Sequence, residues 1–232
     1  MTEFASEYRD HLPTRHETDI VRTFQLSWEA APELGRRILW AMGVLAPVAV
    51  PRSLLRAALD LSAGTCVHDE LEKALDELSR LSLIEVDTSG NPIAHRLILA
   101  FAPHRNVADS ASPFEQCRAA IQAQMDRASL TPAAGVIRDL EPLLPHAESV
   151  LAGSRIRPED VSRLAGSLGM HYQALGRYSG AKRLLREALA SDEKKFKPGH
   201  PSLATRQSNL AALLRNRGQL EEARDLLRKA LA

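Results

Sequence analysis

The C-terminal part of the chain repeats itself with a period of 42 residues. The segment 168–190 aligns without a gap with the segment 210–232. A period of this length is typical of helical hairpins stacked side by side, each leaving an apolar face that its neighbour buries. Nine positions are identical: Leu168/Leu210, Gly176/Gly218, Ala181/Ala223, Leu184/Leu226, Leu185/Leu227, Arg186/Arg228, Ala188/Ala230, Leu189/Leu231 and Ala190/Ala232.

The repeated residue types fit a helical hairpin. Gly176 and Gly218 are predicted to end the first helix of each unit, because a residue without Cβ adopts the positive φ of the turn that follows. We expect Leu185 and Leu227 to fill the gap between neighbouring hairpins. Small residues seven apart, which allow two helices to approach closely, are expected on the inner face of the second helices: Ala181, Ala188, Ala223 and Ala230.

These residues resemble tetratricopeptide repeats, in the longer variety found in kinesin light chains. The resemblance covers residues 157–232 and predicts two repeats, 157–198 and 199–232. It implies a mainly α chain that ends in an α-α superhelix and binds a protein or peptide without catalysing a reaction. The residues that carry it are Pro198-Gly199-His200-Pro201, Asn209-Leu210-Ala211, Gly218, Glu222-Ala223 and Arg228-Lys229-Ala230-Leu231.

The resemblance also implies a groove, lined by the first helix of each hairpin, that holds a partner segment. Asn209 can both donate to and accept from a peptide backbone, and Arg163 and Arg215 would favour acidic groups. Each position is equally consistent with an ordinary solvated polar side chain. The expected groove residues are Arg163, Ser167, Met170 and Gln173 from the first repeat, and Thr205, Ser208, Asn209, Ala212, Arg215 and Asn216 from the second.

The pattern before the repeats predicts three helices and a hairpin. An apolar helical pattern runs over 33–45, a second helix starts after Pro51, and a third starts at Asp69 as its N-cap. Segments 83–86 and 93–95 flank a turn and read as a β-hairpin, followed by a helix over 96–101 that Pro103 ends. This order predicts a winged helix over 16–108, after an N-terminal tail (1–15) and before a helical linker (109–156).

This segment resembles the winged-helix region of NB-ARC-type STAND ATPases, which include many bacterial sensors. In that family, capture of a ligand by the repeats releases the winged helix from a nucleotide-binding domain during signal transduction. The resemblance therefore implies a sensor-side regulatory module. It is carried by Leu26-Ser27-Trp28-Glu29, Ile38-Leu39-Trp40, Leu45-Ala46-Pro47, Val50-Pro51-Arg52, Leu78-Ser79-Arg80-Leu81-Ser82-Leu83-Ile84 and Ala94-His95-Arg96-Leu97.

Nucleotide chemistry is expected only together with another domain. The sequence has no Gly-Lys dipeptide, so the phosphate-binding loop of the parent family is absent from it. His95 occupies the place where the family's histidine contacts bound ADP. It is expected to contact ADP or ATP only if an ATPase domain is present elsewhere, such as in another chain, and otherwise to be a structural histidine. An ADP-sensing module is therefore one alternative function.

A transcriptional regulator that binds DNA through the winged helix is another alternative. The helix that would enter the groove, 69–80, carries five acidic and two basic residues, and the formal net charge of the chain is +1. Neither fits a surface that must approach phosphates. We therefore expect no nucleic-acid partner.

Enzymatic and membrane functions are not indicated. Cys66 and His68 have no second pair at metal-ligand spacing, and no nucleophile motif is present, so we expect neither a metal site nor catalysis. Cys66 and Cys117 do not suggest a disulfide framework. No secretory signal or membrane-spanning apolar run is recognisable, and we expect a cytoplasmic protein.

Overall fold

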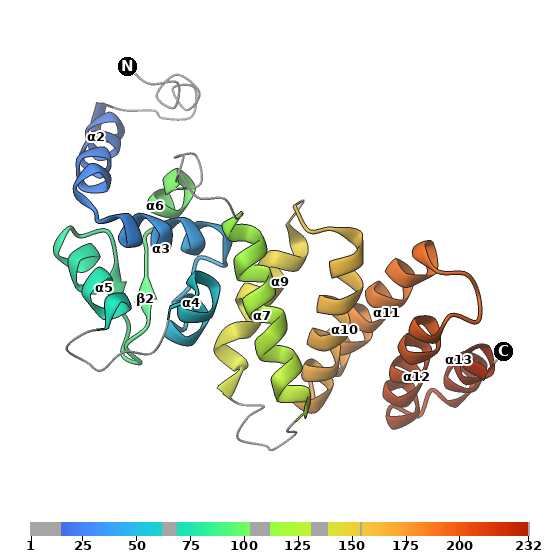
Figure 1. Ribbon diagram of the computed structural model, residues 1–232. Coiled ribbons are helices and arrows are strands. Elements are labelled where there is room, and N and C mark those ends of the chain that lie inside the picture. The colour runs from blue at the N-terminus through green and yellow to red at the C-terminus, as the bar shows by residue number, and fades with distance from the viewer. Residues whose placement is uncertain (1–14, 62–68, 103–111, 131–138, 154, 232) are drawn as a thin grey trace. The chain divides into compact units, whose positions relative to one another are not determined.

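The computed structural model describes residues 15–61, 69–102, 112–130, 139–153 and 155–231. The described chain is mostly helical, with one two-stranded sheet, so the mainly α fold class is confirmed. It divides into two compact units, Met1–Pro113 (unit 1) and Phe114–Ala232 (unit 2) (Figure 1). The expected tail (apart from its last residue), the expected boundary at 108/109, and Cys66, His68 and Pro103 lie outside the described residues.

The helices of unit 1 lie close to where the sequence predicts them. The first predicted helix ends one residue earlier than expected, and the helix before it was not predicted. Trp28 of that unpredicted helix is buried, whereas Leu26 in the same helix is 64% exposed. The elements are α2 (Arg15–Ala30), α3 (Glu33–Val44), α4 (Arg52–Leu59), α5 (Glu70–Arg80), β1 (Glu85–Val86), β2 (Pro92–Ile93) and α6 (Arg96–Phe101).

Helix α3 is the centre of the unit 1 core and contacts α4, α5 and α6. Its side chains Ile38, Leu39 and Met42 are buried. Gly35 lets α5 come close, because a Cβ at this position would lie 3.0 Å from Cδ2 of Leu78. Gly35, Ile38, Leu39 and Met42 recur at helical spacings of three, four and seven positions. They therefore form one continuous buried face along α3.

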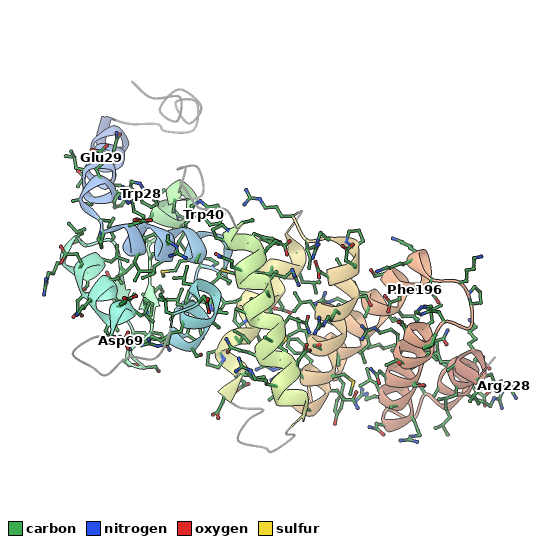
Figure 2. All side chains as sticks on the ribbon, in the orientation of Figure 1. Trp28, Glu29, Trp40, Asp69, Phe196 and Arg228 are labelled. Carbon is green, nitrogen blue, oxygen red and sulfur yellow. The ribbon has the colours of Figure 1, made fainter. Side chains whose placement is uncertain are left out.

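Helix α5 begins at Asp69 as predicted. Its Oδ1 accepts hydrogen bonds from the backbone N–H of Leu71 at 3.0 Å and of Glu72 at 3.4 Å, which satisfies two donors that the first helical turn leaves unpaired. Nη2 of Arg56 lies 2.5 Å from Oδ2 of the same carboxylate. The hydrogen bond from Arg56 lowers the pKa of Asp69. Asp69 (labelled in Figure 2) therefore both caps α5 and ties it to α4.

The hairpin strands are shorter than the expected segments 83–86 and 93–95. Leu83 instead closes the end of α5: its N–H donates to the carbonyl of Leu78 at 2.9 Å, and Ser82 between them has a φ of 56°. At the other end of the hairpin, His95 is the N-cap of α6 and does not pair with the opposite strand. The residues between these two helix ends pair in an antiparallel register that joins Glu85 to Ile93 and Val86 to Pro92.

Unit 2 consists of helices that pack in sequence order (Figure 1). Helices α10 and α11 form one antiparallel pair and α12 and α13 form another, while α11 also packs against α12. We call these pairs repeat 1 and repeat 2. The described helices are α7 (Pro113–Leu130), η2 (Glu141–Leu143), α9 (Leu144–Ala152), α10 (Pro158–Ala174), α11 (Tyr178–Lys195), α12 (Pro201–Asn216) and α13 (Leu220–Leu231).

The turns inside the two repeats have the same conformation. Gly176 and Gly218 both have a φ of 73°, as the sequence predicts. A side chain at this φ would be strained, which explains why glycine occurs at both positions. In each turn the following N–H reaches back to a carbonyl five positions earlier, Arg177 to Tyr172 at 2.8 Å and Gln219 to Leu214 at 2.9 Å.

Burial inside the repeats follows the prediction in repeat 1 and only partly in repeat 2. Ala181 and Ala188 are fully buried and Ala223 is 4% exposed, whereas Ala230 is half-buried. Leu185 is fully buried, as expected for a residue between two hairpins. The same expectation is wrong for Leu227, which is 41% exposed. The reason is that α11 packs between α10 and α12, whereas among the described helices α13 packs mainly against α12 and meets α11 through the ion pairs of Glu222.

Candidate functional site

The expected groove residues lie on α10 and α12, the first helices of the two repeats. We call the face that they form the A face. Among the ten residues, four on α12 and two on α10 are exposed, and the others are half-buried. The two helices differ in what already contacts this face.

The α10 part of the A face is held by α7. Arg163 forms an ion pair with Asp126 of α7. Gln122 of α7 donates a hydrogen bond from Nε2 to Oγ of Ser167 at 3.0 Å, and the Ser167 hydroxyl lies 3.4 Å from Oδ1 of Asp126. An acidic partner group would have to replace Asp126 to reach Arg163. Further along α10, Met170 is 39% exposed, and Gln173 is half-buried.

The α12 part of the A face is open. Thr205, Ser208, Arg215 and Asn216 are exposed, and Asn209 and Ala212 between them are half-buried. The Thr205 hydroxyl donates to the carbonyl of Pro201 at 3.0 Å, so its hydroxyl hydrogen is already used within the helix. The residues that could contact a partner on α12 are therefore Ser208, Asn209, Ala212, Arg215 and Asn216.

The charge of α12 favours an acidic partner. The helix contains two arginines, Arg206 and Arg215, and no acidic residue. The buried carboxylate of Asp192 neutralises Arg206. Arg215, which is exposed, is then the charge that α12 presents to a partner. A guanidinium group forms paired hydrogen bonds with a carboxylate, which adds direction to the attraction.

Arg206 joins α12 to both helices of repeat 1, a role that the sequence analysis missed. Its Nε lies 3.1 Å from Oγ of Ser162 on α10 and 3.1 Å from Oδ2 of Asp192 on α11. Gly166 makes room for the guanidinium, because a Cβ there would lie 2.3 Å from Nη1 of Arg206. The Arg206 guanidinium thus fixes α12 to α11 through the Asp192 carboxylate and to α10 through the Ser162 hydroxyl, and with them the spacing of the A face.

Helices α7 and α9 continue the same arrangement on the other side of repeat 1. Arg118 of α7 is ion-paired with Asp160 of α10 at 3.0 Å. Along the second helices, Glu148 of α9 contacts Arg183 of α11 at 3.5 Å, much as Glu222 of α13 contacts Lys182 of α11 at 3.5 Å. Gln122 and Asp126 therefore belong to the A face, and the sequence analysis missed them because α7 has no counterpart in the 42-residue alignment.

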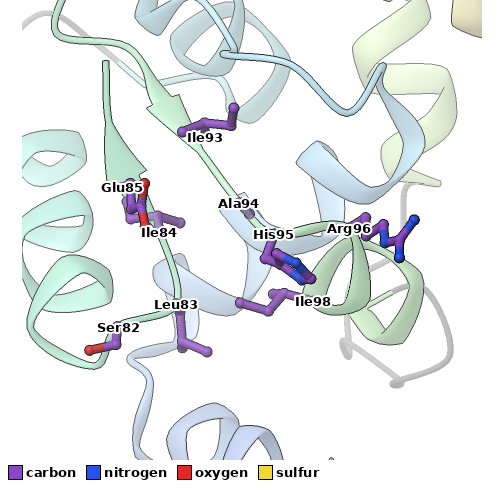
Figure 3. A pocket seen from close by; sticks show the side chains of 9 residues that line it. All are labelled: Ser82, Leu83, Ile84, Glu85, Ile93, Ala94, His95, Arg96 and Ile98. Carbon is purple, nitrogen blue, oxygen red and sulfur yellow. The ribbon is translucent and has the colours of Figure 1, made fainter. Parts of the chain in front are cut away.

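His95 lies in unit 1 beside a pocket of about 350 Å³. Its Nδ1 accepts a hydrogen bond from the N–H of Leu97 at 3.3 Å, so the neutral ring carries its proton on Nε2 and can still donate there. Figure 3 shows the guanidinium of Arg96 pointing away from the other lining side chains. The pocket is lined by Ser82, Leu83, Ile84, Glu85, Ile93, Ala94, His95, Arg96 and Ile98.

The described residues offer little for other kinds of chemistry. Within them, no cluster of three or more His, Cys, Asp or Glu side chains could hold a metal ion. Burial raises the pKa of the Cys117 thiol to about 12, so it carries almost no thiolate at neutral pH. None of the described helices has the length and apolar content to cross a membrane.

The comparison with protein families identifies the repeats. A family model described as Tetratricopeptide repeat matches residues 160–232, which is less than half of the chain. No curated protein matches the chain. The tetratricopeptide part of the resemblance is therefore confirmed. Repeats of this family are non-enzymatic and generally mediate protein–protein interaction, which is consistent with an interaction role for residues 160–232.

Proposed function

We propose that this chain is a non-catalytic regulatory module whose repeats capture an acidic segment of a protein partner on α12. Unit 1 is a winged helix that relays this capture, as in the sensor-side part of a STAND-like signalling protein of the cytoplasm. The observation that carries the proposal is the contrast along the A face. On α10, the groove residues Arg163 and Ser167 already contact Gln122 and Asp126 of α7. On α12, most of the groove residues are exposed, and the helix carries Arg215 and no acidic residue.

A bait experiment tests the capture. Immobilised chain is incubated with a lysate of its source cells and bound proteins are quantified by mass spectrometry. The double variant Asn209→Ala with Arg215→Ala removes the amide and the charge from α12 without touching a buried residue. We expect it to lose at least about tenfold of the specific partner, since a charged hydrogen bond and an amide contact together contribute about 2–3 kcal/mol.

The control removes two charged side chains from a surface outside the A face and leaves the net charge unchanged. Glu193 and Lys194 are exposed residues of α11, and Glu193→Ala with Lys194→Ala should leave partner recovery unchanged. A set of synthetic ten-residue peptides with and without glutamates, tested by fluorescence anisotropy, then checks the preference for acid. Equal recovery by both double variants, or equal binding of neutral and acidic peptides, would reject the α12 site.

The relay rests on unit 1 and on His95. Helices α3, α4 and α5 followed by a hairpin have the order of a winged helix, and the pocket at the hairpin leaves the Nε2 of His95 able to donate to an anion. Glu85 lines the same pocket, and its carboxylate would repel a phosphate bound by unit 1 alone. Calorimetry with ADP should therefore show no binding to this chain, and heat beyond dilution would instead support a nucleotide sensor.

DNA binding is the less favoured use of unit 1. Two acids at the start of α5 are partly compensated, since Arg56 pairs with Asp69 and Arg52 lies 3.2 Å from Glu72. Glu70 and Asp76 still add negative charge to this helix. A duplex-DNA titration at low salt should show no binding, because a helix with this charge is repelled by phosphates.

A further inference from the structure

Three side chains from two helices of unit 2 converge on the carboxylate of Asp126 in α7. Nε2 of Gln122 donates to Oδ1 at 2.7 Å, and the Ser167 hydroxyl donates to the same oxygen at 3.4 Å. The guanidinium of Arg163 is ion-paired with Oδ2. An amide N–H, a hydroxyl and a guanidinium are groups that also bind the carboxylate of a partner. We call Gln122, Arg163 and Ser167 the donor set.

The orientation of the Gln122 amide shows that the donor set is built around a carboxylate. Gln122 is 3% exposed, and its Oε1 is buried without a hydrogen-bond partner among the described residues. A buried acceptor that makes no hydrogen bond costs free energy. The reversed amide would place Oε1 against the Asp126 carboxylate instead. The amide therefore leaves its oxygen unpaired in order to donate from Nε2.

Two members of the donor set are residues that the sequence analysis assigns to a partner. Arg163 is expected to favour acidic groups, and Ser167 is expected to line the same groove. Asp126 therefore occupies the place that an acidic group of a partner would take on α10. The side chains of Asp126 and Arg163 are 38% and 63% exposed. An ion pair as exposed as this one contributes little to stability, so a competing carboxylate can open it.

We propose that the donor set is a carboxylate-binding site that Asp126 occupies in the free chain, so that Asp126 limits the affinity for an acidic partner. The inference rests on the proposed function, because it extends the capture of an acidic segment from α12 to α10. A glutamate of the partner competes with Asp126 for Arg163 and is repelled by its charge. Arg215 has no ion-pair partner among the described residues and binds an acid without this competition.

Removal of the Asp126 carboxylate tests the site. Asp126→Asn keeps the size of the side chain and an oxygen for the Gln122 amide, but it releases Arg163. Fluorescence anisotropy of the full chain should show about three- to fivefold tighter binding of the acidic ten-residue peptides, the range expected for one exposed competing charge. Binding of the neutral peptides should not change. Acidic peptides that bind Asp126→Asn no more tightly than the wild type would overturn the proposal.

Further variants locate the gain in affinity. Glu193→Gln removes one negative charge from the exposed surface of α11 and should leave the affinity unchanged. Asp126→Ser, which also removes the carboxylate, should reproduce the gain, whereas Asp126→Glu keeps the charge and should bind like the wild type. Adding Arg163→Ala to Asp126→Asn should abolish the gain, because the released guanidinium is then missing. A gain that survives the loss of Arg163, or that Glu193→Gln reproduces, would assign it to net charge and overturn the site. Circular dichroism checks that each variant stays folded.

The same titrations separate this site from the site on α12. If Arg215→Ala weakens binding of the acidic peptides and Asp126→Asn does not strengthen it, capture on α12 stands and the carboxylate site on α10 is wrong. If Arg215→Ala has no effect and Asp126→Asn still binds more tightly, the acid binds on α10 and the α12 site is wrong. If neither the wild type nor Asp126→Asn prefers the acidic peptides, both sites are overturned.

Discussion

Repeat 1 and repeat 2 share nine aligned residues and the same turn geometry, yet they differ in what surrounds them. In repeat 1, the polar A face of α10 is held by α7, Leu184 and Leu185 of α11 lie against Gly169 of α10, and α12 also packs against α11. In repeat 2, four of the six A-face residues of α12 are exposed, as are Leu220, Leu227 and Leu231 of α13. The sequence of a repeat therefore determines the conformation of its hairpin, whereas the neighbouring helices determine which of its side chains are exposed.

This difference explains why partner capture is proposed first for α12 of repeat 2. A polar side chain that is already hydrogen-bonded within the chain gains little from a partner, because the new contact replaces an old one. An exposed leucine gains free energy on burial in proportion to the apolar area removed from water. Repeat 1 is stabilised by its neighbours, whereas repeat 2 presents the same kinds of groups to other molecules.

The largest expected effect compares two equivalent leucines. Leu185→Ala should lower the free energy of unfolding of unit 2 by about 3 kcal/mol, because it leaves a cavity at a fully buried site. Leu227→Ala should cost less than about 1 kcal/mol, because its side chain is already in contact with water. Urea denaturation followed by circular dichroism measures both.

Unit 1 supplies an internal control for this pair. Both tryptophans of the chain, Trp28 and Trp40, lie in unit 1, so their fluorescence follows a transition that neither variant should shift. Equal losses for the two leucines would mean that α13 is covered in solution, and the contrast between the repeats would then be wrong.

A second, smaller effect concerns the residue that holds the repeats together. Arg206→Ala leaves the carboxylate of Asp192, whose side chain is 7% exposed, without its ion pair. We expect a loss of about 2 kcal/mol, below the range for fully buried pairs because the Arg206 side chain is 19% exposed. Thermal unfolding at pH 7 measures this loss.

Two further variants sharpen the interpretation of Arg206. Asp192→Asn with Arg206→Met removes both charges and should recover much of the loss, since no charge is then buried alone. Arg215→Ala, on the exposed part of the same helix, should leave stability nearly unchanged. If Arg206→Ala left the stability unchanged, the spacing of the A face would not depend on this ion pair.

The smallest effect concerns a position at which the repeats differ. Glu222 stands where repeat 1 has Gly180, whose Cβ would lie 2.6 Å from Cδ2 of Tyr172. The hydrogen bond from Arg186 lowers the pKa of Glu222. A carboxyl whose pKa is lower in the folded state stabilises the fold above its unfolded pKa, about 4.3, and loses this contribution as the pH falls through the folded pKa.

Glu222→Gln should therefore destabilise unit 2 at pH 7 and lose its effect in acid. We expect no more than about 0.5 kcal/mol, because the Glu222 side chain is 39% exposed and water screens the pair. Unfolding midpoints of wild type and variant, measured between pH 7 and pH 3, should converge as the pH falls. A difference that persists at pH 3 would assign the effect to packing instead of charge.

The parts of the fold that sequence reasoning predicted depend on short stretches of chain. Asp69 was identified as an N-cap because an aspartate before an apolar helical pattern accepts from the first amides. The strands of the hairpin were predicted too long. Their outer residues hydrogen-bond to the ends of α5 and α6 instead of to the opposite strand, and β propensity does not reveal this. Helix α2 was missed although Ile20, Phe24 and Trp28 recur at helical spacing, so its apolar period was present in the sequence and was overlooked.

The candidate groove stays a prediction, and the structure shows only which helices carry its residues and what already contacts them. The alignment placed its ten residues on α10 and α12, where the structure has them. It could not reveal that Asp126 holds Arg163, because the two residues are 37 positions apart in sequence and belong to helices without sequence similarity. It also missed Arg206, since nothing in the local sequence distinguishes an arginine that reaches a buried carboxylate from one that reaches water.

The sequence alone determined the hairpins: the period of 42, the glycines at positive φ and the alanines that let helices approach are properties of neighbouring residues. Tertiary structure alone decided which copy of each repeated residue is buried, as Leu185 and Leu227 demonstrate. The physical reason is that backbone conformation depends on a residue and its near neighbours. Burial depends on whether a distant segment packs against the other side.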